Sequence, residues 1–181
     1  MINDLLLLAR GENRELVVTR EPFPLSPLVD DVAEITQIMA GDRTVTITKP
    51  EANGLMAIGD ANLTRQILLN LASNAVQHAG TGEVSFAFRR RDERVGVAVR
   101  DSGAGIEPEH LPRLFERFYR VEPSRSREHG GAGLGLAIAL MLAELQDGGI
   151  AVESEPGKGT TITLWLPAAA AAPGVDSRGT S

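Results

Sequence analysis

Hydrophobic and polar residues follow two different periods along the chain and predict a mixture of helices and strands. The segment after Asp60 carries an apolar residue at every fourth position, which gives a helix one apolar face. Asp60 itself is the expected N-cap of this helix. The repeating apolar positions are Leu63, Ile67, Leu71 and Ala75. Strand-like patterns, most of them alternating, predict strands over residues 44–49, 83–90, 94–100, 149–155 and 160–166.

Start and stop signals predict further helices. Ser26 is the expected N-cap of a helix that has Pro27 at its first position and ends at Gly41. Residues 1–10 have the pattern of a helix that is stopped by Gly11. The other expected elements are a strand over 15–20, a strand over 55–58 as a candidate partner of 44–49, a short helix near 108–115 and a helix over 134–145.

The order of these elements predicts an α+β fold. Helices and antiparallel hairpins in this order favour a two-layer α/β sandwich, in which a mixed, mainly antiparallel sheet is covered on one face by helices. Residues 101–133 are rich in glycine, proline and charge and contain little regular structure. Long irregular segments inside a compact domain are usually functional, so we expect the site of activity to include this segment.

A ladder of polar side chains lies beside the apolar face of the helix after Asp60. Gln66, Asn70, Asn74 and His78 follow one another at intervals of four residues. Residues four apart stack on one side of a helix. Carboxamides are mediocre helix formers because they compete for backbone hydrogen bonds. The ladder is therefore either a solvated helix face or a row of ligand-binding groups.

Composition narrows the possible functions. A chain of 181 residues with 43% apolar residues is long enough for one sizeable globular domain. Its net charge of −6 argues against nucleic-acid binding. Without cysteine and with three scattered histidines, neither disulfides nor a structural zinc site is expected. The apolar run at residues 5–9 is too short to span a membrane, so we expect a soluble chain in a reducing compartment.

Three glycine-rich clusters carry candidate chemistry. DSGAG begins with Asp101, whose carboxylate can accept a hydrogen bond from an exocyclic amine such as that of adenine. GGAGLGLA, residues 130–137, opens directly into a helix, and its backbone N–H groups can bind phosphate. PGKGT, residues 156–160, lies between two predicted strands. Each cluster alone is usually an ordinary turn, so the evidence lies in their combination.

Five motifs in one order resemble the ATP-binding catalytic domain of bacterial sensor histidine kinases. This domain belongs to the GHKL superfamily, with the Bergerat fold, shared with DNA gyrase, a heat-shock chaperone and the MutL repair proteins. NLASNAVQHA resembles the N box, DSGAG the G1 box, FERFYR the F box, GAGLGLA the G2 box and GKGT the third glycine box. The resemblance is close over residues 60–167 and extends backward to a dimerisation helix and linker.

The resemblance implies Mg²⁺ and ATP as ligands and gives roles to individual residues. Asn74 is implied to coordinate Mg²⁺, a hard cation for which a neutral amide oxygen is suitable. Asp101 would bind adenine, Tyr119 would lie near the adenine or ribose, and Arg120 would reach the phosphates. Asn70 and Arg120 are the implied catalytic residues. The full implied ATP-binding set is Asn70, Asn74, Gln77, His78, Asp101, Gly103, Gly105, Ile106, Tyr119, Arg120, Gly131, Gly133, Leu134, Gly135, Leu136 and Thr160.

The resemblance also implies a flexible ATP lid over residues 106–132. Within it, Phe115 and Phe118 are expected to pack against the domain rather than to bind nucleotide. His78 either contacts the phosphates or the lid, or belongs to a solvated helix face.

Three positions distinguish this chain from its relatives. Hydrolytic members of the superfamily and anti-sigma-factor serine kinases have a glutamate where this chain has Asn70, and an amide is a poor general base. We therefore expect ATP binding with slow hydrolysis. Ala132 stands where a hydroxyl residue is usual, and Gln77 stands where a basic residue usually helps to hold phosphate. Both changes weaken phosphate binding.

The resemblance implies that residues 1–12 end the second dimerisation helix, that 13–167 form the catalytic domain, and that 168–181 are a disordered tail. None of the three histidines has the sequence context of a phosphoacceptor. The acceptor is therefore expected on a dimerisation domain, either in a longer form of this chain or in a partner subunit. A response regulator would then receive the phosphoryl group. The full-length parent is expected to be a membrane-bound homodimer with this part in the cytoplasm.

Two alternatives stay open. One is an anti-sigma-factor-type serine kinase, against which Asn70 and FERFYR count. The other is a nucleotide-binding regulatory module without kinase activity, consistent with Ala132 and Gln77.

Overall fold

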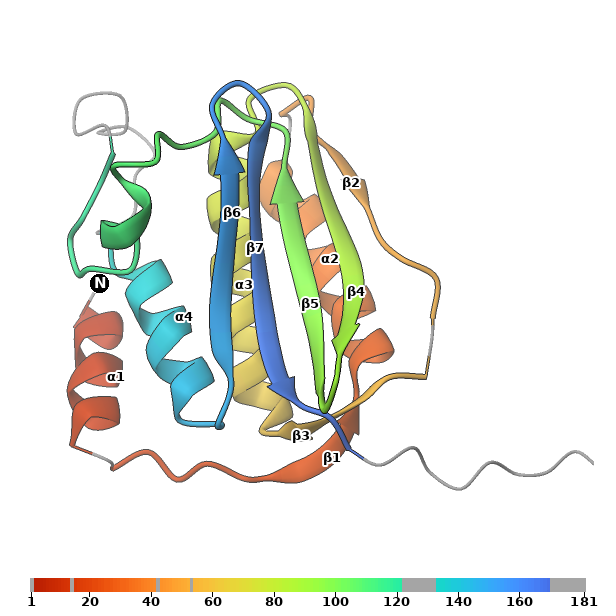
Figure 1. Ribbon diagram of the computed structural model, residues 1–181, viewed down its shortest axis with the longest axis vertical. Helices are drawn as coiled ribbons and strands as arrows, with labels where there is room; N and C mark the ends of the chain where they lie inside the picture. Colours follow the sequence, from red (N-terminus) through yellow and green to blue (C-terminus); the bar gives the residue numbers. More distant parts are fainter. Residues whose placement is uncertain (1, 14, 42, 53, 122–132, 170–181) are drawn as a thin grey trace, which may run out of the picture.

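Helices cover one face of an open sheet in the computed structural model, which describes residues 2–13, 15–41, 43–52, 54–121 and 133–169 (Figure 1). The elements are α1 (Ile2–Glu12), β1 (Glu21–Pro24), α2 (Leu25–Ala40), β2 (Thr46–Thr48), β3 (Met56–Gly59), α3 (Ala61–His78), β4 (Glu83–Arg91), β5 (Arg94–Asp101), a 3₁₀ turn (Leu111–Arg113), α4 (Gly135–Glu144), β6 (Gly149–Glu155) and β7 (Gly159–Pro167). This arrangement confirms the predicted α+β fold.

The main sheet is mixed and mostly antiparallel. Its strands lie in the order β2-β4-β5-β7-β6. β2 runs parallel to β4, and the other three neighbouring pairs are antiparallel. β3, predicted over 55–58 as a partner of the 44–49 strand, instead pairs with β1 in a separate two-stranded sheet. That prediction was wrong because the partner strand lies far back in the chain, where local patterns give no information.

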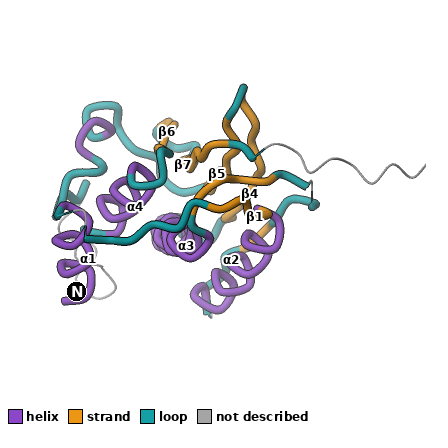
Figure 2. Tube along the Cα trace, turned by 90° about the horizontal axis from the view of Figure 1, so that it is seen from below, coloured by secondary structure: helices purple, strands orange, loops and turns teal. Residues whose placement is uncertain are grey.

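The core lies between the helical layer and the main sheet (Figure 2). Ile67, Leu68 and Leu71 of α3 are completely buried or nearly so, as are Val95 and Val97 of β5. Burying a side chain of this size contributes about 1.5–3 kcal/mol. The Asp60 carboxylate accepts hydrogen bonds from the amides of Asn62 and Leu63, which confirms the predicted N-cap of α3.

The start of α2 differs from the prediction. The N-cap is Pro24, without a side-chain hydrogen bond, and not Ser26. Leu25 is almost completely buried, and its amide donates to the carbonyl of Leu55 at 3.0 Å. Burial and this long-range bond therefore fix the helix start in place of a side-chain cap. The predicted stop is confirmed, since Gly41 has φ +55° and its N–H donates to the carbonyl of Ile38.

Helix α1 continues through Gly11, where the sequence predicted a stop. A Cβ at Gly11 would lie 2.2 Å from Sδ of Met141, so the glycine permits close contact between α1 and α4. The predicted strand over 15–20 is absent, and the described residues of that segment are irregular chain leading to β1.

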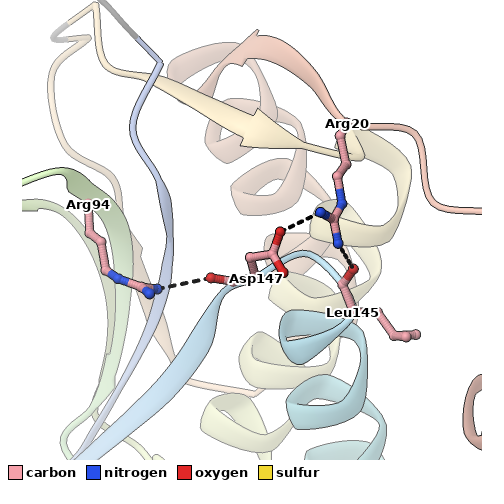
Figure 3. Close-up of polar contacts among 4 residues, drawn as sticks. All are labelled: Arg20, Arg94, Leu145 and Asp147. Carbon is pink, nitrogen blue, oxygen red and sulfur yellow. Dashed lines mark hydrogen bonds and ion pairs between the residues drawn. The ribbon is translucent and has the colours of Figure 1, made fainter.

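Three segments that are far apart in the sequence meet at the turn after α4 (Figure 3). The guanidinium of Arg20 forms an ion pair with the Asp147 carboxylate at 2.5 Å and donates to the carbonyl of Leu145 at 3.2 Å. From the other side, Arg94 donates to the Asp147 carbonyl at 3.1 Å. We call these contacts the Asp147 clasp. The clasp fastens the segment before β1 and the start of β5 to the same turn.

The chain continues its pairing beyond Pro167, the predicted end of the domain. The Ala168 amide donates to the carbonyl of Glu93 and the Ala169 amide to that of Met56. The predicted disordered tail lies mostly outside the described residues. Among the helices of the described ranges, none has both the length and the apolar character needed to cross a membrane.

Candidate functional site

Asp101 is a buried acid at the end of β5. It is 4% exposed and pairs with Thr160 in the register of β5 and β7. Its Oδ1 accepts a hydrogen bond from the Gly103 amide at 2.9 Å. Burial raises the pKa of Asp101, and the hydrogen bond from Gly103 and the nearby His78 partly oppose this rise. A buried carboxylate with a raised pKa is typical of a functional site.

The turn after Asp101 rests on the end of α3. A Cβ at Gly103 would lie 2.1 Å from the carbonyl oxygen of His78, so only glycine allows this approach. His78 therefore lies at the Asp101 end of the polar ladder. The ladder thus runs from this acid toward Asn74 and Asn70, one helical turn at a time.

Ser154 connects the same turn to β6 and β7. Its hydroxyl oxygen accepts from the Ile106 amide at 2.9 Å, and its O–H donates to the carbonyl of Gly159 at 3.0 Å. The Thr160 hydroxyl lies 2.9 Å from the same oxygen. Because the single proton of Ser154 is used on Gly159, Thr160 is the donor to Ser154. The predicted site residues Ile106 and Thr160 are thus joined by a serine that no local pattern singled out.

Gly105 allows the turn after Asp101 to bend toward the end of β6. It has φ +72°, and a Cβ there would lie 2.2 Å from the carbonyl oxygen of Glu155. The turn therefore packs directly against the end of β6.

The start of α4 lies beside the middle of the ladder. Asn70 donates from its amide nitrogen to the carbonyl of Gly135 at 3.2 Å. Leu134 is the N-cap of α4 and provides no side-chain hydrogen bond to the first N–H groups. The first N–H groups of a helix and its positive end favour an anion. Leu134 is buried, Leu136 is half-buried, and Gly135 is exposed beside Asn70.

In the described part of the predicted lid, residues 106–121, Tyr119 contacts other residues of the same segment, which the sequence did not predict. The Tyr119 hydroxyl lies 2.7 Å from Nδ1 of His110, and the Arg113 guanidinium lies 4.3 Å from the centre of the Tyr119 ring. The predicted helix near 108–115 is one 3₁₀ turn. Tyr119, expected near adenine or ribose, is therefore engaged with its own lid segment.

Phe118 does not pack as predicted. Its side chain is 61% exposed and its φ is +62°. The backbone explains this, because the Phe118 amide donates to the carbonyl of Gly133, which itself has φ +70°. Phe115, in contrast, is half-buried and lines a cavity of about 420 Å³ with residues of α1 and α4. Arg120 is half-buried at the end of this segment, whereas Gly131 and Ala132 lie outside the described residues.

The donors at this site suit a metal that arrives with a nucleotide. No group of three or more His, Cys, Asp or Glu side chains within the described ranges could hold a metal ion. Asn74 offers a half-buried amide on the ladder between Asn70 and His78. Mg²⁺ often takes only one or two protein oxygens and obtains its other ligands from phosphates and water. The Asn74 amide therefore fits a Mg²⁺ ion carried by phosphates.

The site residues named from the sequence thus form three groups around α3. The first group lies at the end of α3 and consists of His78, Asp101, Gly103, Gly105, Ile106 and Thr160. The second group lies along the middle of α3 and consists of Asn70, Asn74 and Leu134–Leu136. The third group lies at the described edges of the predicted lid and consists of Tyr119, Arg120 and Gly133. Gln77 lies on the side of α3 that faces α2, in a hollow with Met39 and Arg43.

Comparison with known proteins identifies similar chains. Residues 59–170 match the family described as histidine kinase-, DNA gyrase B-, and HSP90-like ATPase. The sensor-like histidine kinase SenX3 of Mycobacterium tuberculosis is 37% identical over 169 residues, which cover 93% of this chain and 41% of SenX3. The sensor histidine kinase CusS of Escherichia coli is 38% identical over 169 residues, which cover 93% of this chain and 35% of CusS. The chain therefore spans less than half the length of these relatives.

Solved structures show the same fold. Full-length ShkA in complex with AMPPNP superposes with a TM-score of 0.83 and 32% identity, covering 95% of this chain and 36% of ShkA. The catalytic domain of the histidine kinase ThkA superposes with a TM-score of 0.69 over 82% of this chain and 95% of ThkA. At 22% identity, ThkA supports the fold alone.

Proposed function

This chain belongs to the family of histidine kinase-, DNA gyrase B-, and HSP90-like ATPases, and we propose that it is the ATP-binding catalytic part of a sensor histidine kinase. It binds ATP with Mg²⁺ and transfers the γ-phosphoryl group to a histidine on a dimerisation domain. The acceptor belongs to the full-length protein or to a partner subunit. A response regulator then takes the phosphoryl group from that histidine.

The observation that carries this proposal is the position of Asp101 relative to the polar ladder. A buried carboxylate that makes no ion pair with any described residue is costly to keep in an apoprotein. Backbone groups of Gly103 and Thr160 already donate to this carboxylate. An adenine amino group supplies a further donor, because the two oxygens of a carboxylate offer about four acceptor positions. From there, the amides of Asn74 and Asn70 lead toward the start of α4, where phosphate is favoured.

The chain acts by positioning and charge neutralisation. Asn74 would hold Mg²⁺, and the ion would supply positive charge to the phosphate oxygens. Asn70, held to Gly135, fixes the distance between the ladder and the glycine loop. The attacking imidazole comes from the acceptor domain, and Arg120 stabilises the charge on the transferring group. Since Asn70 is a poor general base, transfer to water is slow.

The proposed function also implies a division of the chain into two parts. Residues 1–12 end the second dimerisation helix, and the catalytic domain begins at residue 13. We propose that it includes residues 168 and 169 beyond the predicted end at 167, since the amides of Ala168 and Ala169 donate to the carbonyls of Glu93 and Met56. The parent protein is a membrane-bound homodimer, and this part lies in the cytoplasm.

The test uses the full chain, a histidine-bearing dimerisation domain and ATP labelled at the γ position. We expect an acid-labile phosphohistidine on the added domain and no labelled serine. Asn74→Ala abolishes the label while the circular dichroism spectrum stays unchanged. Nucleotide binding with no transfer would instead indicate a regulatory module, and a stable phosphoserine on a candidate substrate would indicate a serine kinase. Normal transfer by Asn74→Ala would refute the metal assignment.

A further inference from the structure

A surface hollow of about 250 Å³ lies beside the polar ladder, on the side of α3 that faces α2. It is lined by Met39, Arg43, Ser73, Val76 and Gln77. Figure 2 shows α2 and α4 on opposite sides of α3, and the lining residues Met39 and Arg43 place this hollow on the α2 side. None of these five residues except Gln77 was expected to take part in nucleotide binding.

The hollow adjoins the strip of α3 that carries Asn70. Gln77 follows Asn70 by seven residues, which is about two helical turns, so the two amides lie on nearly the same strip of the helix surface. Ser73 lies one turn before Gln77 and three residues after Asn70. A phosphate chain that runs along the ladder therefore passes the mouth of the hollow.

Arg43 is the charged member of the hollow, and its backbone is fixed. Its amide donates to the carbonyl of Ala40 at 3.0 Å, and its carbonyl accepts from Val45 at 2.8 Å. The guanidinium makes one long hydrogen bond, from Nη1 to the carbonyl of Val76 at 3.4 Å. It forms no ion pair with any carboxylate in the part of the chain that the structure describes. A guanidinium has five N–H donors, so most of them are available to an anion.

We infer that Arg43 binds the phosphates of the nucleotide and takes the place of the basic residue that position 77 lacks. This inference rests on the proposed function. The positive charge comes from the turn after α2 instead of from α3, and Gln77 and Ser73 contribute neutral hydrogen bonds beside it. To bind a phosphate, the guanidinium of Arg43 would give up the long hydrogen bond of 3.4 Å to the carbonyl of Val76. Its fork of donors suits two phosphate oxygens at once.

A simpler role for Arg43 is to interact with the last carbonyl groups of α3, where a cation is favoured. The two roles predict different measurements. If Arg43 only stabilises the end of α3, its substitution lowers the stability of the protein and changes the affinities of ATP, ADP and adenosine equally. A phosphate-binding role affects ATP and ADP binding and leaves adenosine binding unchanged.

The experiment measures the affinities of ATP, ADP and adenosine by calorimetry, at two salt concentrations, for wild type, Arg43→Gln and Arg90→Gln. Arg90 is a matched control, an exposed arginine on β4. We expect Arg43→Gln to weaken ATP binding about tenfold, the effect of losing one charge-assisted contact. We expect adenosine binding to stay unchanged and the salt dependence of ATP binding to become weaker. Arg90→Gln should match wild type.

A second variant makes the test independent of folding effects. Gln77→Lys added to Arg43→Gln should restore most of the lost ATP affinity, because it returns a cation to the same hollow. An unchanged ratio of ATP to adenosine affinity in Arg43→Gln would overturn the inference, whether or not its melting temperature falls. If wild type binds neither ATP nor adenosine, the proposed function fails and this inference fails with it.

Discussion

At the scale of one residue, the Asp101 carboxylate lowers the stability of the folded chain, and its proposed role is to bind the ligand. Its carboxylate is almost completely buried, and its hydrogen bonds come from neutral backbone groups. Burial of the charge disfavours the ionised form, and the raised pKa is the sign of that cost. Under the proposed function, the same oxygen atoms accept a hydrogen bond from the adenine amine, which explains why a costly buried carboxylate is kept.

Asp101→Asn should therefore stabilise the apoprotein near neutral pH and weaken adenosine binding by at least tenfold. The carboxamide oxygen can still accept from the Gly103 amide, but its NH₂ group opposes the adenine amine. A folded-state pKa above the usual value of 3.8 means that the wild type loses stability as pH rises from about 3.8 through the raised pKa. The advantage of the variant should thus be largest at pH 7 and should shrink toward pH 4.

Urea unfolding at pH 7, 5.5 and 4, combined with calorimetric titration of adenosine, measures both effects. A variant that is less stable than wild type at pH 7 would contradict the argument, since it would show that the ionised carboxylate stabilises the apoprotein.

At the scale of elements, Gln146 connects the two helices that carry the site. It follows α4 and is 1% exposed. Its Oε1 accepts from the Asp60 amide at 2.7 Å and the Thr64 hydroxyl at 3.2 Å, and its Nε2 donates to the carbonyl of Leu142 at 3.0 Å. One side chain thus joins the end of α4 to the start of α3. The ladder and the glycine loop keep their separation because both helices are fixed at this base.

Gln146→Leu should lower the free energy of unfolding by about 2–4 kcal/mol. The leucine has a similar volume, but it leaves the half-buried Asp60 amide and the buried Thr64 hydroxyl without their acceptor, at about 1–3 kcal/mol each. Gln37→Leu on the exposed part of α2 is the matched control and should change stability by less than about 0.5 kcal/mol. Urea denaturation checks both variants. Equal midpoints would mean that water replaces the lost acceptor.

The elements that the sequence predicted well are those whose signals are local. The Asp60 cap, the Gly41 stop and the hairpin of β4 and β5 depend on neighbouring residues, and all three were confirmed. The predicted start of α2 at Ser26 and the predicted stop of α1 at Gly11 were wrong, because contacts with Leu55 and Met141 override the local signals. A local pattern contains no information about a partner that lies 30 residues away, as Leu55 does from Leu25, or 130 residues away, as Met141 does from Gly11.

The same distinction applies to the site. The ladder and the DSGAG turn were visible in the sequence because their residues are close together in it. Ser154 bonds to Ile106 across 48 positions, and Gln146 bonds to Asp60 across 86. These polar residues lie in ordinary-looking segments, so only the folded chain reveals their role. Tyr119 was assigned by resemblance, and its contact with His110 depends on the path of the lid.

At the scale of the whole molecule, the Asp147 clasp joins the segment after α1 to the turn after α4 and to the start of β5 (Figure 3). Arg20 and Asp147 have side-chain exposures of 53% and 62%. Ion pairs with this much solvent contact contribute about 1 kcal/mol or less. The clasp therefore fixes the position of the segment before β1, and it contributes little to the free energy of unfolding.

Arg20→Gln should accordingly lower the melting temperature by no more than about 4 °C for a chain of this length. The loss should become smaller at 1 M salt, where the wild-type ion pair is screened. Arg20→Lys is a useful control, because it keeps the charge but lacks the fork that reaches both Asp147 and Leu145. Differential scanning calorimetry at two salt concentrations checks this. A decrease above 8 °C would show that the clasp supports the core.

The open sheet has a consequence for the behaviour of the protein at high concentration. One outer strand, β2, has only three residues, and the other, β6, exposes Glu153 and Glu155. Unpaired outer strands are templates for self-association, and short length and negative charge are two ways by which proteins prevent it. Both outer strands of the sheet are thus protected against fibril-like stacking, one by its shortness and the other by its charge.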